Sequence, residues 1–585
     1  MNKNEVATLL EDIATLLSLK EGSSVFEVRA YENAARTINA LDGDIEEMVQ
    51  QGQLKGLPGI GPTLLKRIEE AVTTGHITFY DELRASTPPV KLEMMRIPGL
   101  GPKKINAIYD NLHVTSIAEL EQACKEDRVA HLPGFGKKTQ ENILKGIAHL
   151  AQHSERYLYP IAEQEAEQIR AGLATLPQIV RLQIAGSLRR RRETVKDIDM
   201  VASVADDADS EARRAIMDFF VSQPSVQAVT NKGETKSSVI LRSTIAMDLR
   251  VVNDSQFPYT LHHFTGSKEH HIPLRRRALG MNITINDYGI FKIVNGQEEL
   301  IPCHTEADIY AALGLDYIEP ELREDMGEIE AAATHSLPVL LEERDLRGVL
   351  HAHSTWSDGQ ATIRAMAEAC IARGYSYLGI TDHSKVAAYA NGLSEERLRK
   401  QGEEIDRLNE EFAGRFRILK GTECDILRDG TLDYSDEVLA SLDFAVASIH
   451  SNFNLSREEQ TERMLRAIAN PYVDIIGHPT GRILLGRAGY ELDMDAVIEA
   501  AVAHNVCIEV NAHPSRLDID WRYLHHARDK GMKTSINPDA HSTTGIDDMR
   551  YGVGVARKGW IRASDVLNAM PIDELLAYLR ARRQA

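Results

Sequence analysis

The sequence has little cysteine, and this scarcity excludes several classes of site. Its five cysteines lie far apart along 585 residues, and none belongs to a Cys-x-x-Cys pair: Cys124, Cys303, Cys370, Cys424 and Cys507. A disulfide framework or a thiolate zinc site is therefore not expected, and a reducing cytoplasm fits. The chain also lacks an apolar run of membrane-spanning length, so we expect no transmembrane helix. Met1 to Lys20 alternates Leu and Ile with Glu and Asp, which predicts an amphipathic helix of the mature protein rather than a cleaved signal.

Positive charge is also in deficit. The chain has 67 Lys and Arg against 87 Asp and Glu, a net charge of −20, which argues against indiscriminate binding of polyanions. Local basic surfaces still set phosphate contacts. Such clusters occur at Lys103-Lys104, Lys137-Lys138, Arg189 to Arg192 and Arg275 to Arg277. Hydrophobic residues make up 43% of the chain, and 585 residues exceed what one core can hold, so several folded domains are expected.

An internal repeat marks the N-terminal part, which reads as helical. Leu57-Pro58-Gly59-Ile60-Gly61 recurs as Ile97-Pro98-Gly99-Leu100-Gly101 and as Leu132-Pro133-Gly134-Phe135-Gly136, each before a Lys-containing helical segment. Glycine permits a tight turn, and the helix that the turn opens has free N–H groups for a phosphate oxygen. The alternative is three tight helix connections without a ligand. Three copies in one context favour helix-hairpin-helix motifs that bind DNA at Gly59, Gly61, Gly99, Gly101, Gly134 and Gly136.

The middle region carries three carboxylates at strand spacing. Asp197 and Asp199 are two residues apart and project to one face of a strand, and Asp248 lies in a second strand-like run, Ile245 to Val252. Carboxylates that converge repel one another unless cations lie among them, and their hard oxygen ligands suit magnesium. The preceding Gly186-Ser187 turn can present N–H and hydroxyl donors to a phosphate, and Arg190 can add a charged fork.

The C-terminal region alternates short apolar strands with amphipathic helices, which predicts a barrel-like parallel sheet. The predicted strands include Tyr377 to Thr381, Phe444 to Ser448, Val473 to Gly477 and Val506 to Val510. Histidines and acidic residues follow these runs, at the strand ends where barrels place their ligands. Such side chains hold zinc, manganese or iron and imply hydrolysis by metal-activated water. Nine candidates are present: His351, His353, Asp358, His383, Glu423, His450, His478, Asp539 and His541.

The order Gly186-Ser187, Asp197-x-Asp199, Asp248, Phe264-Thr265-Gly266-Ser267 and Arg275 resembles the catalytic core of family X DNA polymerases. The resemblance covers the whole chain. The N-terminal helical part looks like the deoxyribose-phosphate-binding and fingers-like domains of that family, and the last region is similar to the polymerase-and-histidinol-phosphatase (PHP) domain fused to bacterial members. It implies that Asp197, Asp199 and Asp248 hold two magnesium ions and that Asp248 helps to activate the primer 3′-hydroxyl. It further implies a nucleotide site at Gly186, Ser187, Arg190, Phe264, Gly266 and Arg275.

For the C-terminal region the resemblance implies that all nine candidates are ligands of two or three manganese, zinc or iron ions. It also implies manganese-dependent 3′–5′ exonuclease activity, with related AP-endonuclease or 3′-end phosphoesterase work. His513 stands where Asn is expected and receives no role, and His504 is interpreted as structural. The lyase lysine of eukaryotic members is replaced by Arg67, which cannot form a Schiff base, so no lyase is predicted there.

Two positions in the nucleotide site depart from the family pattern. His263 stands where Tyr is usual, and His271 stands where Asn commonly contacts the base edge. These changes leave the metal chemistry intact but leave sugar and base selection open.

We therefore expect a multidomain α and α/β protein with a helical N-terminal part, an α+β nucleotidyltransferase palm with a thumb, and a distorted β/α barrel. The predicted domains are a DNA-end-binding domain at 1–86, a fingers-like domain at 87–150, a palm at 151–260, a thumb at 261–318, a linker at 319–345 and a PHP domain at 346–585.

The leading hypothesis is a monomeric, cytoplasmic and nucleoid-associated DNA polymerase that fills short gaps in repair. It would use gapped or primed DNA and dNTPs, with its own metal-dependent nuclease and no membrane contact. Three alternatives remain open at this point. The chain could be a DNA-end nuclease or phosphatase with a weak or inactive polymerase core, a small-molecule PHP phosphatase, or a scaffold that binds DNA ends without catalysis.

Overall fold

The computed structural model describes residues 3–584 except 21, 23, 40, 42–44, 58, 96, 98, 154 and 155. The chain divides into two compact units. One holds residues 1–154 with the short segments 486–488 and 542–544, and the other holds the remaining residues. Among the described residues no helix combines the length and the apolar character that a membrane crossing requires.

The N-terminal unit is helical, as predicted. The amphipathic helix expected at its start spans Lys3–Leu19, and Met1 lies outside the described residues. Leu10, Ile13 and Leu17 are buried at the three- and four-residue spacing that places side chains on one helix face. The helices are α1 (Lys3–Leu19), α2 (Val25–Asn39), α3 (Ile45–Gln50), α4 (Pro62–Thr74), α5 (Thr78–Ser86), α6 (Pro89–Met95), α7 (Pro102–Leu112), α8 (Ile117–Lys125) and α9 (Lys137–His153).

The three repeats fold into the same turn. In each copy the fourth residue donates its backbone N–H to the carbonyl of the first, with N···O distances of 3.1, 3.1 and 3.0 Å. The first glycine of each copy, at 59, 99 and 134, has a φ of 82°, 78° and 80°, a left-handed conformation that favours glycine. The turns lead into α4, α7 and α9. Pro58 and Pro98 lie outside the described residues.

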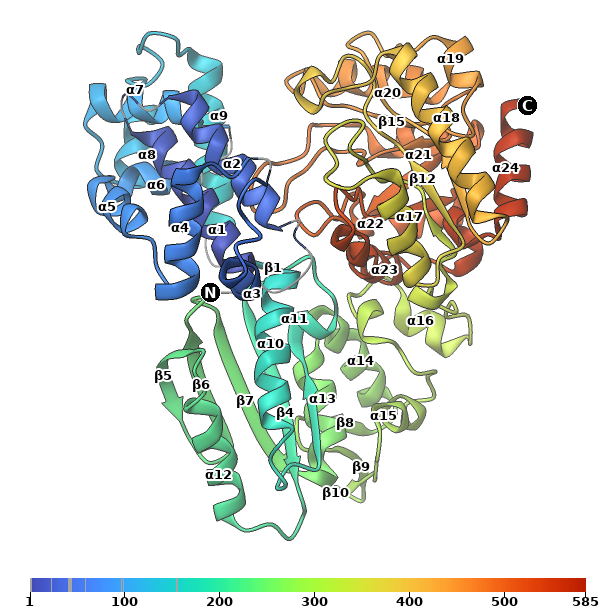
Figure 1. Cartoon of the computed structure of the whole chain (residues 1–585). Helices are drawn as coiled ribbons and strands as arrows, with labels where there is room; N and C mark the ends of the chain where they lie inside the picture. Colours follow the sequence, from blue (N-terminus) through green and yellow to red (C-terminus); the bar gives the residue numbers. More distant parts are fainter. Residues whose placement is uncertain are drawn as a thin grey trace. The chain divides into compact units, whose positions relative to one another are not determined.

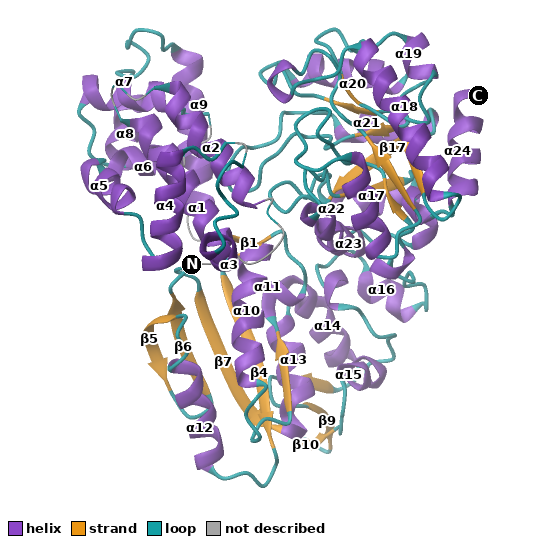
Figure 2. Cartoon of the chain, in the orientation of Figure 1, coloured by secondary structure: helices purple, strands orange, loops and turns teal. Residues whose placement is uncertain are grey.

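The middle region is built on a five-stranded sheet in the order β2-β4-β7-β6-β5 (Figure 2). Alternate residues of its strands pack on α10 and α12, while the opposite face of β4 and β7 packs on α13. This alternation leaves one sheet face available for polar side chains beside α13. The elements are β1 (Tyr157–Leu158), α10 (Tyr159–Leu173), β2 (Arg181–Ile184), α11 (Gly186–Arg189), β3 (Thr194–Val195), β4 (Asp197–Val204), α12 (Ser210–Val221), β5 (Val226–Lys232), β6 (Lys236–Leu241), β7 (Ala246–Asn253) and α13 (Phe257–Thr265).

A three-stranded antiparallel sheet and short helices follow. Their shared core includes Leu322, Ile329 and Leu340, so the segment predicted as a linker contributes apolar side chains to it. Trp560 of the C-terminal region packs in the same core. The elements are α14 (Lys268–Gly280), β8 (Ile283–Ile285), β9 (Ile290–Val294), β10 (Gln297–Leu300), α15 (Glu306–Ala312), a 3₁₀ turn at Pro320–Leu322 and α16 (Glu328–Ala333).

The C-terminal region has the predicted parallel strands, in two sheets ordered β11-β12-β13 and β14-β15-β16-β17-β18. Single bridges join His383 to Glu423 between the sheets and Ala352 to Ala540 between the first and last strands. The helices pack around these strands (Figure 1). The strands are β11 (Gly348–Val349), β12 (Tyr377–Ile380), β13 (Arg417–Lys420), β14 (Glu423–Asp425), β15 (Val446–Ser448), β16 (Ile475–Ile476), β17 (Cys507–Asn511) and β18 (Thr534–Asn537). The helices are α17 (Ile363–Ala372), α18 (Glu395–Phe412), α19 (Asp436–Ala440), α20 (Arg457–Ile468), α21 (Met494–Ala503), α22 (Trp521–Asp529), α23 (Met549–Lys558) and α24 (Ile572–Gln584).

Candidate active sites

The structure brings the three carboxylates of the middle region to one face of its sheet. Strands β4 and β7 pair in parallel, with Asp199 directly opposite Asp248, and Asp197 lies two residues earlier on the same face. Val201 and Val252 continue this face and pack in the core that α13 shares. Asp197, Asp199 and Asp248 therefore cluster at the end of α13, as a metal pair requires.

Burial and the neighbouring carboxylates both disfavour the charged form of Asp199. Burial, then the charges of Asp197 and Asp248, raise the pKa of Asp199 to about 7. The ammonium of Lys236 lies 2.6 Å from Oδ2 of Asp248 and offsets part of the negative charge. This site contains more negative charge than its own cations neutralise, so it fits divalent cations.

The predicted phosphate-binding turn lies against the carboxylates. Gly186 has a φ of 64°, and a Cβ added to it would collide with Oδ2 of Asp199, so only glycine fits. Ser187 and Arg190 line a pocket of about 560 Å³ together with Arg156, Arg192, Lys196, Glu269, Glu324, Met326, Trp521 and Arg522. Five of these residues are basic, and this composition suits a polyphosphate.

The other predicted nucleotide residues lie around the end of α13. Phe264 stacks under the guanidinium of Arg250, 4.0 Å from the ring centroid, and Gly266 is the C-cap of the helix. A Cβ on Gly266 would lie 3.0 Å from Nη1 of Arg190, so the two predicted groups are adjacent. Arg275 is exposed on α14.

The two departures from the family pattern contact each other. Nε2 of His271 lies 3.1 Å from the carbonyl oxygen of His263, and the two rings stack with centroids 5.8 Å apart. Burial lowers the pKa of His271 to about 3, so its ring is neutral and Nε2 donates to the carbonyl.

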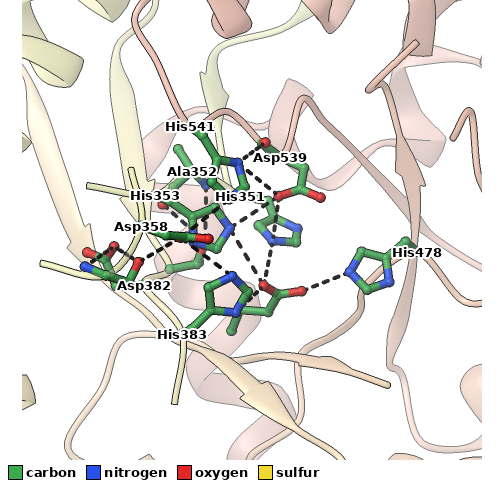
Figure 3. Close-up of polar contacts among 12 residues, drawn as sticks. His351, Ala352, His353, Asp358, Asp382, His383, His478, Asp539 and His541 are labelled. Carbon is green, nitrogen blue, oxygen red and sulfur yellow. Dashed lines mark hydrogen bonds and ion pairs between the residues drawn. The ribbon is translucent and has the colours of Figure 1, made fainter. Parts of the chain in front are cut away.

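In the C-terminal region the candidate side chains lie close together, and the histidines among them follow the carboxyl ends of strands. Figure 3 labels His351, His353, Asp358, His383, His478, Asp539 and His541. Glu423 on β14 lies at their centre. Its Oε1 is 2.9 Å from Nε2 of His478 and 3.2 Å from Nε2 of His450. Its Oε2 is 3.0 Å from Nδ1 of His383 and 3.5 Å from Nε2 of His351. One carboxylate thus contacts histidines from four strand ends.

Asp539 and Asp358 occupy the remaining sides. Oδ1 of Asp539 lies 3.2 Å from Nε2 of His353, and Oδ1 of Asp358 lies 3.4 Å from Nε2 of His541. Burial opposes protonation of His541, but the hydrogen bond and charge of Asp358 raise its pKa to about 9. In His353, burial and the neighbouring His541 and His383 lower the pKa to about 3. A neutral, buried imidazole has a nitrogen lone pair that can coordinate a metal ion.

The donor set fits metal ions. Eight of the nine side chains form three groups whose ligand atoms lie within 4.8 Å of one another: His353, Asp358, His383 and His541; His351, His353 and Asp539; and His383, Glu423 and His450. Buried nitrogens of four histidines make no hydrogen bond among the described residues: His351, His353, His383 and His478. Buried polar atoms normally have a hydrogen-bond partner, so these nitrogens are suited to coordinate metal ions.

Comparisons with known proteins identify the family of this chain. A protein of Bacillus subtilis (strain 168) named DNA polymerase/3′-5′ exonuclease PolX is 42% identical over 583 residues, which cover 99% of this chain and 100% of the relative. The chain belongs to the bacterial family X DNA polymerases.

Family models match four segments. A helix-hairpin-helix domain matches residues 1–77, a SAM-like helix-hairpin-helix tandem 91–148, a DNA polymerase beta thumb 260–324 and a PHP domain 350–513. Smaller relatives cover less of the chain. A probable phosphatase of Thermoanaerobacter sp. (strain X514) is 29% identical over 247 residues, 40% of this chain and 94% of the relative. A probable phosphatase of Acetivibrio thermocellus is 35% identical over 171 residues, 28% of this chain and 64% of the relative.

The PHP domain also contains acidic residues that the sequence analysis did not identify. Glu509 accepts a hydrogen bond from Nδ1 of His351 at 2.7 Å and from the backbone N–H of His478 at 2.8 Å. Asp425 lies 3.2 Å from Nδ1 of His450. The sequence pattern could have identified Asp425, because it lies two residues after Glu423 on the same strand. Glu509 lies inside an apolar run and had no such signal.

Three further positions behave as structural residues. His504 is the C-cap residue of α21. Nδ1 of His513 lies 2.8 Å from the hydroxyl of Ser515, and the backbone N–H of His513 donates to Asn511. Arg67 lies with its guanidinium carbon 3.6 Å from the ring centroid of Phe79, so its charge is held by a cation–π contact.

Proposed function

We propose that this protein is a DNA-directed DNA polymerase that fills short gaps in DNA repair. One observation carries the proposal: Asp197, Asp199 and Asp248 share one sheet face directly beside the turn that begins at Gly186. Magnesium ions bound there would stabilise the negative charge on the reacting oxygens and on the leaving pyrophosphate. Asp248 would help to deprotonate the primer 3′-hydroxyl, while Ser187 and Arg190 orient the phosphates.

The rest of the nucleotide site is proposed to select sugar and base. Phe264, Gly266 and Arg275 would line the sugar and the nascent base pair. His263 and His271 replace the usual Tyr and Asn, and their rings stack on each other. Steady-state comparison of dNTP and rNTP incorporation would measure their effect on ribonucleotide discrimination.

We further propose that the PHP domain is a metal-dependent 3′–5′ exonuclease. Two or three manganese, zinc or iron ions, held by the nine side chains around Glu423, would supply a nucleophilic hydroxide and stabilise charge on the phosphate oxygens. Glu423 would bridge ions, because both of its oxygens face histidine nitrogens. The buried histidine nitrogens without hydrogen bonds support this assignment most directly.

DNA would be held by the three helix-hairpin-helix turns, at Gly59, Gly61, Gly99, Gly101, Gly134 and Gly136. Gly61 and Gly101 are the N-caps of their helices and make no side-chain capping bond. Pro62 and Pro102 follow them and have no N–H, so the N–H groups of Thr63 and Lys103 would be the first to bind a phosphate oxygen. With gapped DNA and dNTPs as partners, we propose that the protein acts as a monomer at the nucleoid.

A single gapped-duplex assay tests both centres. Extension in magnesium and trimming of the 3′ end in manganese are both expected from the wild type. Asp199→Ala is expected to abolish extension and leave trimming, and His353→Ala is expected to do the reverse. Extension that survives Asp197→Ala combined with Asp199→Ala would refute the polymerase assignment.

Phosphoesterase action on other ends is a second candidate for the PHP domain. It is favoured by the two probable phosphatases, whose similarity covers 40% and 28% of this chain. Incision at abasic sites and removal of 3′-phosphates should then require the same metals as the nuclease. A purely small-molecule phosphatase would show DNA affinity that is weak and insensitive to salt.

A further inference from the structure

Lys558, the last residue of α23 in the PHP domain, has a fully buried side chain that is bound to the polymerase half. Its ammonium donates to the carbonyl of Arg190 at 3.0 Å, to the carbonyl of Glu321 at 3.3 Å and to Oε1 of Glu324 at 2.7 Å. An ammonium group has three N–H donors, so these contacts use all of them. A lysine with no exposed surface and three assigned partners fixes the geometry of the groups around it.

Glu324 connects this lysine to the predicted phosphate-binding arginine. Its carboxylate lies 2.7 Å from Lys558, 3.1 Å from Nε of Arg190 and 3.2 Å from Nη1 of Arg192. Burial opposes ionisation, but the charges of Lys558, Arg190 and Arg192 lower the pKa of Glu324 to about 2. The carboxylate is therefore charged at neutral pH and is shared by three cations.

The guanidinium of Arg190 is oriented from two sides. Nε faces Glu324, and Nη1 donates to the carbonyl of Thr265 next to Gly266. The group borders the pocket that Ser187 also lines. A bidentate phosphate contact requires a guanidinium at a fixed angle, so the partners of Arg190 affect its ability to bind.

The segment after Arg190 is held by the PHP domain at a second point. Oε2 of Glu193 accepts from Nε1 of Trp521 at 3.2 Å, and Oε1 accepts from Arg522 at 3.3 Å. The ring of Trp521 also lies 4.6 Å from Nζ of Lys558. Two anchors, at Arg190 and three residues later at Glu193, therefore tie the phosphate-binding segment to the nuclease domain.

We propose that Lys558 is a positioning residue of the polymerase site, through which the PHP domain holds Arg190 ready for the nucleotide phosphates. The inference rests on the proposed role of Arg190. Without Lys558, the carbonyl of Arg190 loses a donor, and Glu324 loses its nearest cation. Glu324 then pairs more tightly with Arg190 and competes with the incoming phosphate. Nucleotide binding thus depends on the nuclease domain independently of its metals.

Steady-state single-nucleotide incorporation by the full-length protein tests this inference. Lys558→Met is expected to raise the KM for dNTP about tenfold and to change kcat less than threefold. The double variant Glu324→Gln with Lys558→Met is expected to lower the KM again, because the competing carboxylate is gone. If Lys558→Met only destabilised the fold, adding Glu324→Gln would not lower the KM for dNTP again. Lys533→Met, which removes a PHP-domain lysine bound to the carbonyl of Ser564, is the matched control.

Folding and function are checked in the same set of variants. Manganese-dependent trimming of single-stranded DNA reports on the PHP fold and should be unchanged in Lys558→Met. Glu193→Gln loosens the other anchor and should raise the KM to a lesser degree, which keeps the inference testable if the buried substitution does not fold. Arg190→Ala should raise the KM more than any of these variants.

The outcomes distinguish the phosphate-binding role of Arg190 from the positioning role of Lys558. If Arg190→Ala leaves the KM for dNTP unchanged, the proposed role of Arg190 is wrong. If Arg190→Ala raises it but neither Lys558→Met nor Glu193→Gln does, the positioning role is overturned and the polymerase assignment stands. A raised KM in Lys558→Met without recovery in the double variant contradicts the route through Glu324.

Discussion

Glu509 accepts a hydrogen bond from Nδ1 of His351 at 2.7 Å, and neither side chain has exposed surface. With a metal ion bound, this contact would keep a proton on Nδ1 and leave Nε2, which faces Glu423 and Asp539, as the ligand atom. Glu509 would thus determine which nitrogen of His351 coordinates the metal.

Glu509→Gln should lower nuclease activity and metal affinity about 10- to 100-fold, the usual effect of removing a partner of a metal-binding histidine. The amide can donate to Nδ1 and so favours the wrong tautomer. Metal titration with a manganese readout and trimming of a 3′ end measure the effect. Glu499→Gln, at an exposed side chain of α21, is the control, and an equal loss in both variants would contradict the prediction.

The raised pKa of Asp199 predicts a pH-dependent cost in metal-free protein. With a pKa of about 7 when folded and 3.8 as its reference value, Asp199 binds more protons in the folded state. The free energy of unfolding therefore falls as pH rises from about 4 to about 7. In chelator, Asp199→Asn should melt higher than wild type at pH 8, with a smaller difference at pH 5.5.

We expect a difference of about 1 kcal/mol at pH 8 because Asp199 is only partly buried, which corresponds to roughly 2–4 °C in Tm for a domain of this size. Differential scanning fluorimetry with and without magnesium measures it. Magnesium should stabilise wild type more than the variant. Asp207→Asn, an exposed change nearby in sequence, should have no pH-dependent effect.

The two glycines of each repeat should respond differently to alanine. Gly99 has a φ of 78°, so Gly99→Ala should destabilise the N-terminal unit by about 1–2 kcal/mol. Gly101 has a φ of −80° with nothing within 4 Å of an added Cβ, so Gly101→Ala should preserve Tm. Its methyl group should nevertheless obstruct the approach of a DNA backbone.

Fluorescence anisotropy with gapped DNA over a salt series tests the second half of this prediction. Gly61→Ala combined with Gly101→Ala should weaken binding severalfold and reduce the slope of log K against log salt. Gly280→Ala, where the new methyl group also meets no atom within 4 Å, is the control outside the repeats. Undiminished DNA affinity in the double variant would remove the helix-hairpin-helix turns from the DNA interface.

Metal removal should affect the two activities separately. Glu423→Gln removes the charge that faces His351, His383 and His478, so it should reduce the metal content of the protein and abolish trimming. Magnesium-dependent extension should remain within about twofold of wild type. Elemental analysis after dialysis measures the metal, and Glu437→Gln on α19 is the control. Full metal content in Glu423→Gln would exclude a bridging role.

The sequence analysis predicted the features that depend on local sequence patterns. The two-residue period of β4 fixed the shared face of Asp197 and Asp199, and the repeats located the turns before α4, α7 and α9. Lys236 reaches Asp248 through the antiparallel pairing of β6 with β7, which the sequence analysis did not predict. Lys558 was missed because it acts across a distance in sequence that only tertiary packing closes. Lys558 is 234 positions from Glu324, and no spacing rule links two residues so separated. The segment 319–345 was interpreted as a linker from its acidity, whereas Leu322, Ile329 and Leu340 between those charges join a core.

The pairing of Ala352 with Ala540 has a consequence for biosynthesis. These residues stand between the ligands of the first strand end and those of the last, and the N–H of His353 donates to the carbonyl of Ala540 at 2.8 Å. The ribosome must therefore have added Asp539 and His541 before the proposed hydrolytic centre can close. We expect no hydrolysis by a growing polypeptide that ends before these residues.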